Sequence, residues 1–279
     1  MNIALEILAK AILPTHLKSA EIRAEIAAAI RRRSLFTARC AERAFLDPLQ
    51  TVCADFAGGK INHATAREKL RAVLDDLGYD PLAGGWPDDP RNDGLPLANE
   101  LEDLTSTRRL DLILETQREK ATSLGMLKSE TDRTRRMYPA WRLVRVKAPM
   151  KEGTGRDWAE RWLDAADWVN WEGVATEGFV ALKGSPIWQA LADGAGGYED
   201  VFTDSPPVPP FAFNSGMAWN SVSRAECEAL GLDPDDAEAV DASLSPGERE
   251  LAEAAKRHGD GFMEEMIAEL KAEGLSWTS

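Results

Sequence analysis

The chain has 279 residues, of which 44% are hydrophobic and 29% are charged. These values are ordinary for a protein that folds around a core, and they exclude disorder as the main state. The formal net charge of −14 argues against a protein that binds nucleic acid through its overall field. Three widely spaced cysteines, Cys40, Cys53 and Cys227, do not make a disulfide framework and favour a reducing compartment.

Charge is distributed unevenly along the chain. Residues 105–151 contain twelve Lys/Arg and five Asp/Glu, a net of +7, whereas residues 233–279 contain four and thirteen, a net of −9. The middle of the chain can therefore face an acidic partner. The N-terminus has no early positive cluster or small-residue cleavage site, and no apolar run reaches the length of a bilayer span. We expect a chain that is neither exported by a signal peptide nor inserted in a membrane.

Residues 1–79 are predicted to form a helical N-terminal domain. Ser19 is the expected N-cap of a helix whose isoleucines recur every four residues. A second helix is expected over 37–56, kinked or split by Pro48. Asn62 is the expected N-cap of a third helix with a clear apolar face.

Residues 80–98 predict a linker, because they are rich in Pro, Gly, Asp and Asn and have no periodicity. A long helix is expected over 106–137 and is ended by Pro139. A strand is expected over 141–147, where aromatic and β-branched residues mix with basic ones.

A Trp-rich region follows, over residues 149–220. It predicts a short helix over 156–166, a strand over 179–183 and a further helix that begins at Ser185. Six of the nine tryptophans lie here, and they either fill a core or form a stacking platform for sugars or bases. We favour the core, because aromatic side chains bury a large area in a region with few long elements. These six are Trp158, Trp162, Trp168, Trp171, Trp188 and Trp219.

Residues 233–279 are expected to form an acidic, helical C-terminal tail, with a capping box that begins at Ser245. The predicted fold class is α+β and predominantly α-helical. A helical N-terminal domain would be followed by a mixed module over 99–232 that contains a small β-sheet.

The sequence contains no recognisable catalytic or metal-binding constellation. Its three histidines stand apart in the sequence, and CxxC, HExxH, GxSxG, phosphate-loop and GxGxxG motifs are absent. We therefore predict no enzymatic activity, no catalytic residue, no metal, no cofactor and no small-molecule substrate. One enzymatic alternative stays open, because Glu226 and Glu228 have the spacing seen in ADP-ribosyltransferases. That activity requires a strand beside a cleft, and a helix at these residues would exclude it.

A cluster of basic residues is the main candidate for an interaction site. It can contact the phosphates of DNA, as in a nucleic-acid-binding accessory protein. It can also complement an acidic partner, including the acidic C-terminal helices of the same or a neighbouring chain. The cluster comprises Arg133, Arg135, Arg136, Arg142 and Arg145.

Four segments in this order resemble the phage Mu F-like family of minor head proteins, also called head morphogenesis proteins. They are RLDLILETQ at 109–117, PAWRLVRV at 139–146, PPVPPF at 206–211 and FNSGMAW at 213–219. The resemblance covers roughly residues 100–232. Many members of the family carry Cys-x-Cys after the last tryptophan and a histidine in the middle segment. This chain has neither, so a metal or thiol role has no residues here.

The resemblance implies a structural protein, present in few copies at the portal or inside the head of a bacteriophage or prophage. Its implied roles are head assembly, portal association and DNA packaging or delivery. The implied partners are the phage portal protein, the major capsid protein and packaged DNA. The implied location is the virion, after assembly in the host cytoplasm.

Overall fold

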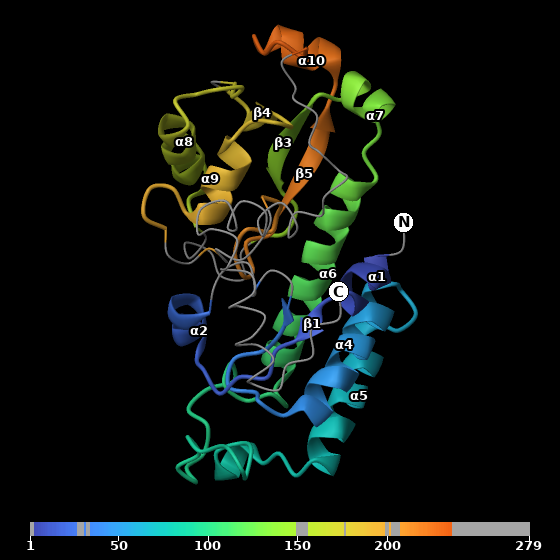
Figure 1. Ribbon diagram of the computed structural model, residues 1–279, viewed down its shortest axis with the longest axis vertical. Coiled ribbons are helices and arrows are strands. Elements are labelled where there is room, and N and C mark those ends of the chain that lie inside the picture. Colours follow the sequence, from blue (N-terminus) through green and yellow to red (C-terminus); the bar gives the residue numbers. More distant parts are fainter. Residues whose placement is uncertain are drawn as a thin grey trace, which may run out of the picture. The chain divides into compact units, whose positions relative to one another are not determined.

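A computed structural model describes residues 3–26, 31, 34–148, 156–175, 177–198, 201 and 207–235. This part of the chain is α+β and mostly helical, with a small antiparallel sheet, which confirms the predicted fold class (Figure 1). It divides into two compact units, one containing Met1–Ala121 and the other beginning at Thr122. No helix among these residues combines the length and apolar character of a membrane span. The capping box expected at Ser245 lies outside the described residues.

The first unit is built from helices and one very short parallel sheet. Strands β1 and β2 pair with Ala11 opposite Ser34, an element that the sequence did not predict. In chain order the elements are α1 (Ile3–Leu8), β1 (Ala11–Ile12), α2 (Ser19–Glu25), β2 (Ser34–Leu35), α4 (Arg43–Ala57), α5 (His63–Asp76), the short 3-10 helix η1 (Pro81–Ala83) and the first part of α6 (Thr107–Lys128).

Helices α4 and α5 form the centre of this unit and lie side by side (Figure 1). Asn62 caps α5 as predicted, since its side-chain oxygen accepts a hydrogen bond from the backbone N–H of Thr65. The helix expected over 37–56 begins only at Arg43, and it continues through Pro48 to Ala57 as one element. Helix α2 begins at Ser19, one residue after its N-cap.

The predicted linker contributes an aromatic side chain to the core of the first unit. Trp86 packs against Tyr79 and Phe45, with ring centroids 4.9 Å and 6.0 Å away. It is buried in the same cluster as Leu70 and Leu74 of α5. The division into a domain over 1–79 and a linker over 80–98 stays a prediction.

The second unit contains the antiparallel sheet, whose strand order is β4-β3-β5. Strand β3 is central, and its register places Trp141 opposite Ala181 on one neighbour and Ser221 on the other. After the end of α6, the elements are α7 (Asp132–Met137), β3 (Ala140–Arg145), α8 (Trp158–Trp168), β4 (Val180–Leu182), α9 (Ile187–Asp193), β5 (Met217–Val222) and α10 (Arg224–Ala229).

The helix predicted over 106–137 is two helices. Helix α6 ends at Lys128, and Thr131 begins α7 by accepting a hydrogen bond from the backbone N–H of Thr134 at 3.2 Å. This capping box favours a new helix start at this point, because the side chains of Thr131 and Thr134 accept hydrogen bonds from backbone N–H groups that would otherwise lack a partner. The strands predicted over 141–147 and 179–183 are confirmed as β3 and β4, whereas β5 was not predicted.

The two faces of the sheet are covered by different helices. Alternate residues of β3 point to opposite faces, so Trp141 joins the cluster that contains residues of α8 and α9. Ala140 instead joins the cluster that contains Cys227 of α10. Figure 1 shows α8 and α9 on one side of the strands and α10 at one end of the sheet.

Candidate functional site

The five arginines of the predicted cluster lie in three different settings. Arg133 and Arg136 are exposed on α7 and lie three residues apart, hence on one face of that helix. Neither forms a hydrogen bond or ion pair with another described residue. We call these two residues the α7 basic face. Arg135, between them, forms an ion pair with Asp132 at 3.0 Å.

The two arginines of β3 are used inside the second unit. Arg142 donates from Nη2 to Oε1 of Glu226 at 2.7 Å. Arg145 donates to the backbone oxygens of Ser215 and Arg156, at 3.1 Å and 3.2 Å. These contacts tie the central strand to α10, to the residues before α8 and to the loop before β5.

Strand geometry keeps the arginines apart. Arg145 follows Ala140, at the start of β3, by five residues, which is about 17 Å along an extended strand. Helix α7 precedes the strand and Arg145 ends it. The five arginines were grouped because they lie in a basic stretch of the sequence. Of these five, only Arg133 and Arg136 have no partner among the described residues.

The acidic pair proposed for ADP-ribosyl transfer lies on a helix. Glu226 and Glu228 belong to α10, which Ser223 caps by accepting a hydrogen bond from the N–H of Glu226. Glu226 is paired with Arg142. ADP-ribosyl transfer required a strand at these residues, and the helix found there removes the support for this alternative. Local capping chemistry at Ser223 explains the helix.

The tryptophans of the second unit form the core of the unit. The rings of Trp141 and Trp219 stack with centroids 3.8 Å apart and an interplanar angle of 10°. Trp188 packs edge-on against both, at 5.9 Å and 5.4 Å, and against Trp162 at 5.6 Å. Its indole N–H donates to the backbone oxygen of Leu182 at 2.9 Å. The core interpretation therefore holds for these rings.

The other three of the six tryptophans differ in how far they are buried. Trp158 is buried, and Trp171 is half-buried against the same cluster. Trp168, at the end of α8, is 75% exposed. An exposed ring alone does not make a stacking platform, because such a platform needs several rings along a basic groove.

A buried ion pair lies beside the tryptophan core. Lys183 donates from Nζ to both carboxylate oxygens of Glu130, at 2.6 Å and 2.7 Å. The side chain of Lys183 is only 1% exposed, and its ammonium lies 5.3 Å from the centroid of the Trp141 ring. Burial lowers the pKa of Lys183 from its ordinary value, and the pairing with Glu130 opposes that shift. No local pattern in the sequence indicates this pair, because its members are 53 residues apart.

A second polar cluster joins α5 to α6 in the first unit. His63 lies between two carboxylates, with Nε2 at 2.5 Å from Glu115 and Nδ1 at 3.3 Å from Asp111. Arg67 donates to both oxygens of Asp111, at 2.8 Å and 2.9 Å. Arg118 contacts Glu115 and lies over the ring of Phe56. His63 seemed isolated in the sequence because its partners are about fifty residues away.

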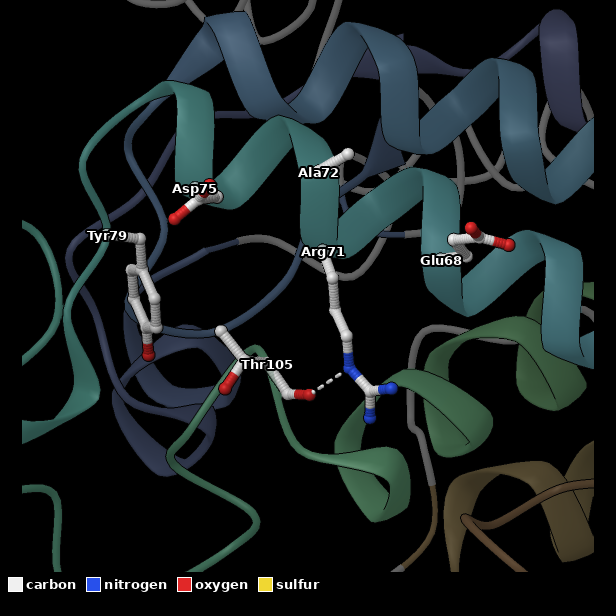
Figure 2. A pocket seen from close by; sticks show the side chains of 6 residues that line it. All are labelled: Glu68, Arg71, Ala72, Asp75, Tyr79 and Thr105. Carbon is white, nitrogen blue, oxygen red and sulfur yellow. Dashed lines mark hydrogen bonds between the residues drawn. The ribbon is translucent and has the colours of Figure 1, made fainter.

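A hollow of about 620 Å³ lies on the surface of the first unit (Figure 2). Arg71 extends across it from α5 and donates to the backbone oxygen of Thr105 at 2.7 Å and to Oγ1 of Thr107 at 2.8 Å. Its guanidinium is therefore held by the chain itself, and the remaining charges of the hollow are carboxylates. The lining residues are Glu68, Arg71, Ala72, Asp75, Tyr79 and Thr105.

The cysteines provide a direct test of the packing. Burial raises the pKa of Cys40 and of Cys53 to about 12, and it also raises the pKa of Cys227. All three thiols are buried, and the thiolate is the reactive form. We expect no reaction with a thiol reagent such as Ellman's reagent at neutral pH in the native protein, and reaction of all three after unfolding. Rapid labelling of a native cysteine would contradict the described core.

Comparison with known proteins gives no relative: no family model, no curated protein and no solved structure matches this chain.

Proposed function

We propose that this chain is a structural minor head protein of a bacteriophage or prophage, similar in kind to the phage Mu F-like proteins. Its role would lie in head assembly, in association with the portal or in DNA packaging and delivery. Its partners would be the portal protein, the major capsid protein or both. The proposal includes no catalytic step.

The main support is the way three of the four resembling segments meet in one core. Trp141, from the segment 139–146, stacks on Trp219, from the segment 213–219. Phe211, from the Pro-rich segment 206–211, is fully buried in the same cluster. The buried hydroxyl of Ser215 donates to the backbone oxygen of Pro210, which ties the last two segments together.

This arrangement makes the three segments depend on one another. Residues that lie more than seventy positions apart build one small core, so each segment depends on the others for burial. Residues 208–211 of the Pro-rich segment are buried, unlike the exposed, extended ligand of a peptide-binding domain. The fourth segment, 109–117, lies on α6 in the first unit.

Several ion pairs of the described residues hold the fold together and are not arranged around a cleft. Among the described residues, the ion pairs Lys183–Glu130 and Arg142–Glu226 join elements of the fold to each other. The histidine with the closest carboxylate contact, His63, bridges α5 to α6. These groups stabilise the fold and leave charged surface for assembly contacts.

Co-expression with the portal protein encoded by the same phage tests the proposal. We expect the tagged, full-length chain to co-elute with the portal protein, or with the major capsid protein, in size-exclusion chromatography at moderate salt. A double charge reversal on the hollow, Glu68→Lys with Asp75→Lys, serves as a surface control outside the second unit. Elution of the chain alone in the presence of each partner would contradict the proposal.

A further inference from the structure

The α7 basic face has charge that no described residue neutralises. Arg133 and Arg136 lie one turn apart, and neither forms a hydrogen bond or ion pair with another described residue. Met137, four residues after Arg133, lies on the same side of the helix and is 49% exposed. Asp132, the one acidic residue of α7, is paired with Arg135. The surface of α7 therefore combines two cations with an exposed apolar side chain.

Helix α8 of the same unit has a surface of the opposite charge. Glu160, Leu163 and Asp167 lie three and four residues apart, hence on one side of the helix, and all three are exposed. The carboxylates of Glu160 and Asp167 form no hydrogen bond or ion pair with another described residue. Trp168, the last residue of the helix, is exposed beside them. We call these four residues the α8 acidic face.

The two surfaces are complementary in charge and in apolar character. Each has two charges without a partner among the described residues, and each has a large exposed apolar side chain next to those charges. The arginine side chains are long and flexible, so their guanidinium groups can adapt to the spacing of the two carboxylates. The exposed ring of Trp168 also attracts a guanidinium group that lies over it.

Within one chain these surfaces lie apart, so a second copy of the chain is the partner that fits. Figure 1 shows α7 and α8 on different sides of the strands of the sheet. Two copies repel each other overall, because each has a net charge of −14. A contact between copies therefore needs a local match of opposite charges, which α7 and α8 supply.

We propose that the α7 basic face of one copy binds the α8 acidic face of a second copy. The two guanidinium groups pair with the two carboxylates, and Met137 packs against Leu163. Because the paired surfaces differ, the contact is head-to-tail, and each added copy leaves one surface of each kind free. Helices of six and eleven residues give a small contact, so association is weak and grows with protein concentration. The inference does not depend on the proposed function, because it concerns the purified chain alone.

Sedimentation velocity of the purified, full-length protein over a series of concentrations tests this contact. At about 0.1 M salt the Debye length is about 10 Å, which screens the overall repulsion between copies. We expect the wild type to associate as its concentration rises. The variant Arg133→Glu, Arg136→Glu and the variant Glu160→Lys, Asp167→Lys should each associate about tenfold or more weakly, because two exposed ion pairs become repulsive.

Combining the substitutions provides the matched control. A mixture of the two variants again offers surfaces of opposite charge, and so does a single chain with all four substitutions. This last variant keeps the wild-type net charge of −14, because its substitutions cancel. Both should associate as strongly as the wild type. A wild type that stays monomeric throughout the series would overturn the proposal. So would association that survives either charge reversal, or failure of the mixture or the four-substitution variant to associate.

Discussion

Replacing Trp188 with alanine is expected to destabilise the protein by about 3–5 kcal/mol, the cost typical of removing a large aromatic side chain from a core. Trp188 is 2% exposed and packs against the rings of Trp141, Trp162 and Trp219. The substitution also leaves the backbone oxygen of Leu182 without its indole donor. The free energy of unfolding, from urea denaturation followed by tryptophan fluorescence, measures the effect.

The matched control is Trp168→Ala on the same unit. Trp168 is 75% exposed, and surface substitutions of this kind usually change stability by less than about 0.5 kcal/mol. The two variants remove the same side chain from opposite environments. If both variants lost the same amount of unfolding free energy, or if neither lost any, the tryptophans would not form the core described above.

Replacing Glu130 with glutamine is expected to destabilise the protein by about 3–5 kcal/mol, because it leaves a buried ammonium without its counter-charge. Lys183 is 1% exposed, and Glu130 contacts it through both oxygens. The double variant Glu130→Leu, Lys183→Met removes both charges and should recover most of the lost stability. If the double variant were as unstable as Glu130→Gln, packing and not the uncompensated charge would explain the loss.

The effect of Glu130→Gln should depend on pH in a defined direction. Burial lowers the pKa of Lys183 in the folded protein, and Glu130 partly offsets this, so the variant lowers that pKa further. Above the folded pKa, the unfolded chain binds more protons at this lysine, and stability rises with pH. The destabilisation by Glu130→Gln should therefore shrink as the pH rises towards the ordinary pKa of lysine, about 10.4. An effect that stays constant or grows would contradict a charged, buried Lys183.

Local signals in the sequence predicted those elements whose determinants lie within a few residues. Asn62 begins α5 because its own side chain accepts a hydrogen bond three residues later. Strand β3 follows the proline that ends the preceding helix, and its alternation matches the two faces of the sheet. These features need no knowledge of distant residues.

Two features of the fold were missed for different reasons, one involving a distant partner and the other a local cap. Strand β5 pairs with β3, more than seventy residues earlier, and its sequence contains Asn220 and Ser221, which do not favour strands. The break between α6 and α7 was missed because the predicted helix was continued to Pro139, although no apolar residue lies between Leu127 and Met137 and Thr131 caps a new helix. Periodicity indicates which face is apolar, but a cap determines where a helix begins.

The candidate site shows the same limit. The arginines were identified from the charge of this stretch of sequence. Arg142 and Arg145 differ from the α7 basic face because they bind Glu226 and backbone oxygens of distant loops. Such partners are set by tertiary structure. The buried pair Lys183–Glu130 was equally invisible, because neither residue differs in the sequence from a solvated surface charge.

Quantitative mass spectrometry of gradient-purified phage heads tests the proposed function most directly. The phage or induced prophage that encodes this chain is grown, and procapsids and mature virions are separated from unassembled protein. We expect the chain in heads at a small, fixed ratio to the major capsid protein. Its absence from both kinds of particle, with the chain abundant in the unassembled fraction, would contradict a structural role in the head.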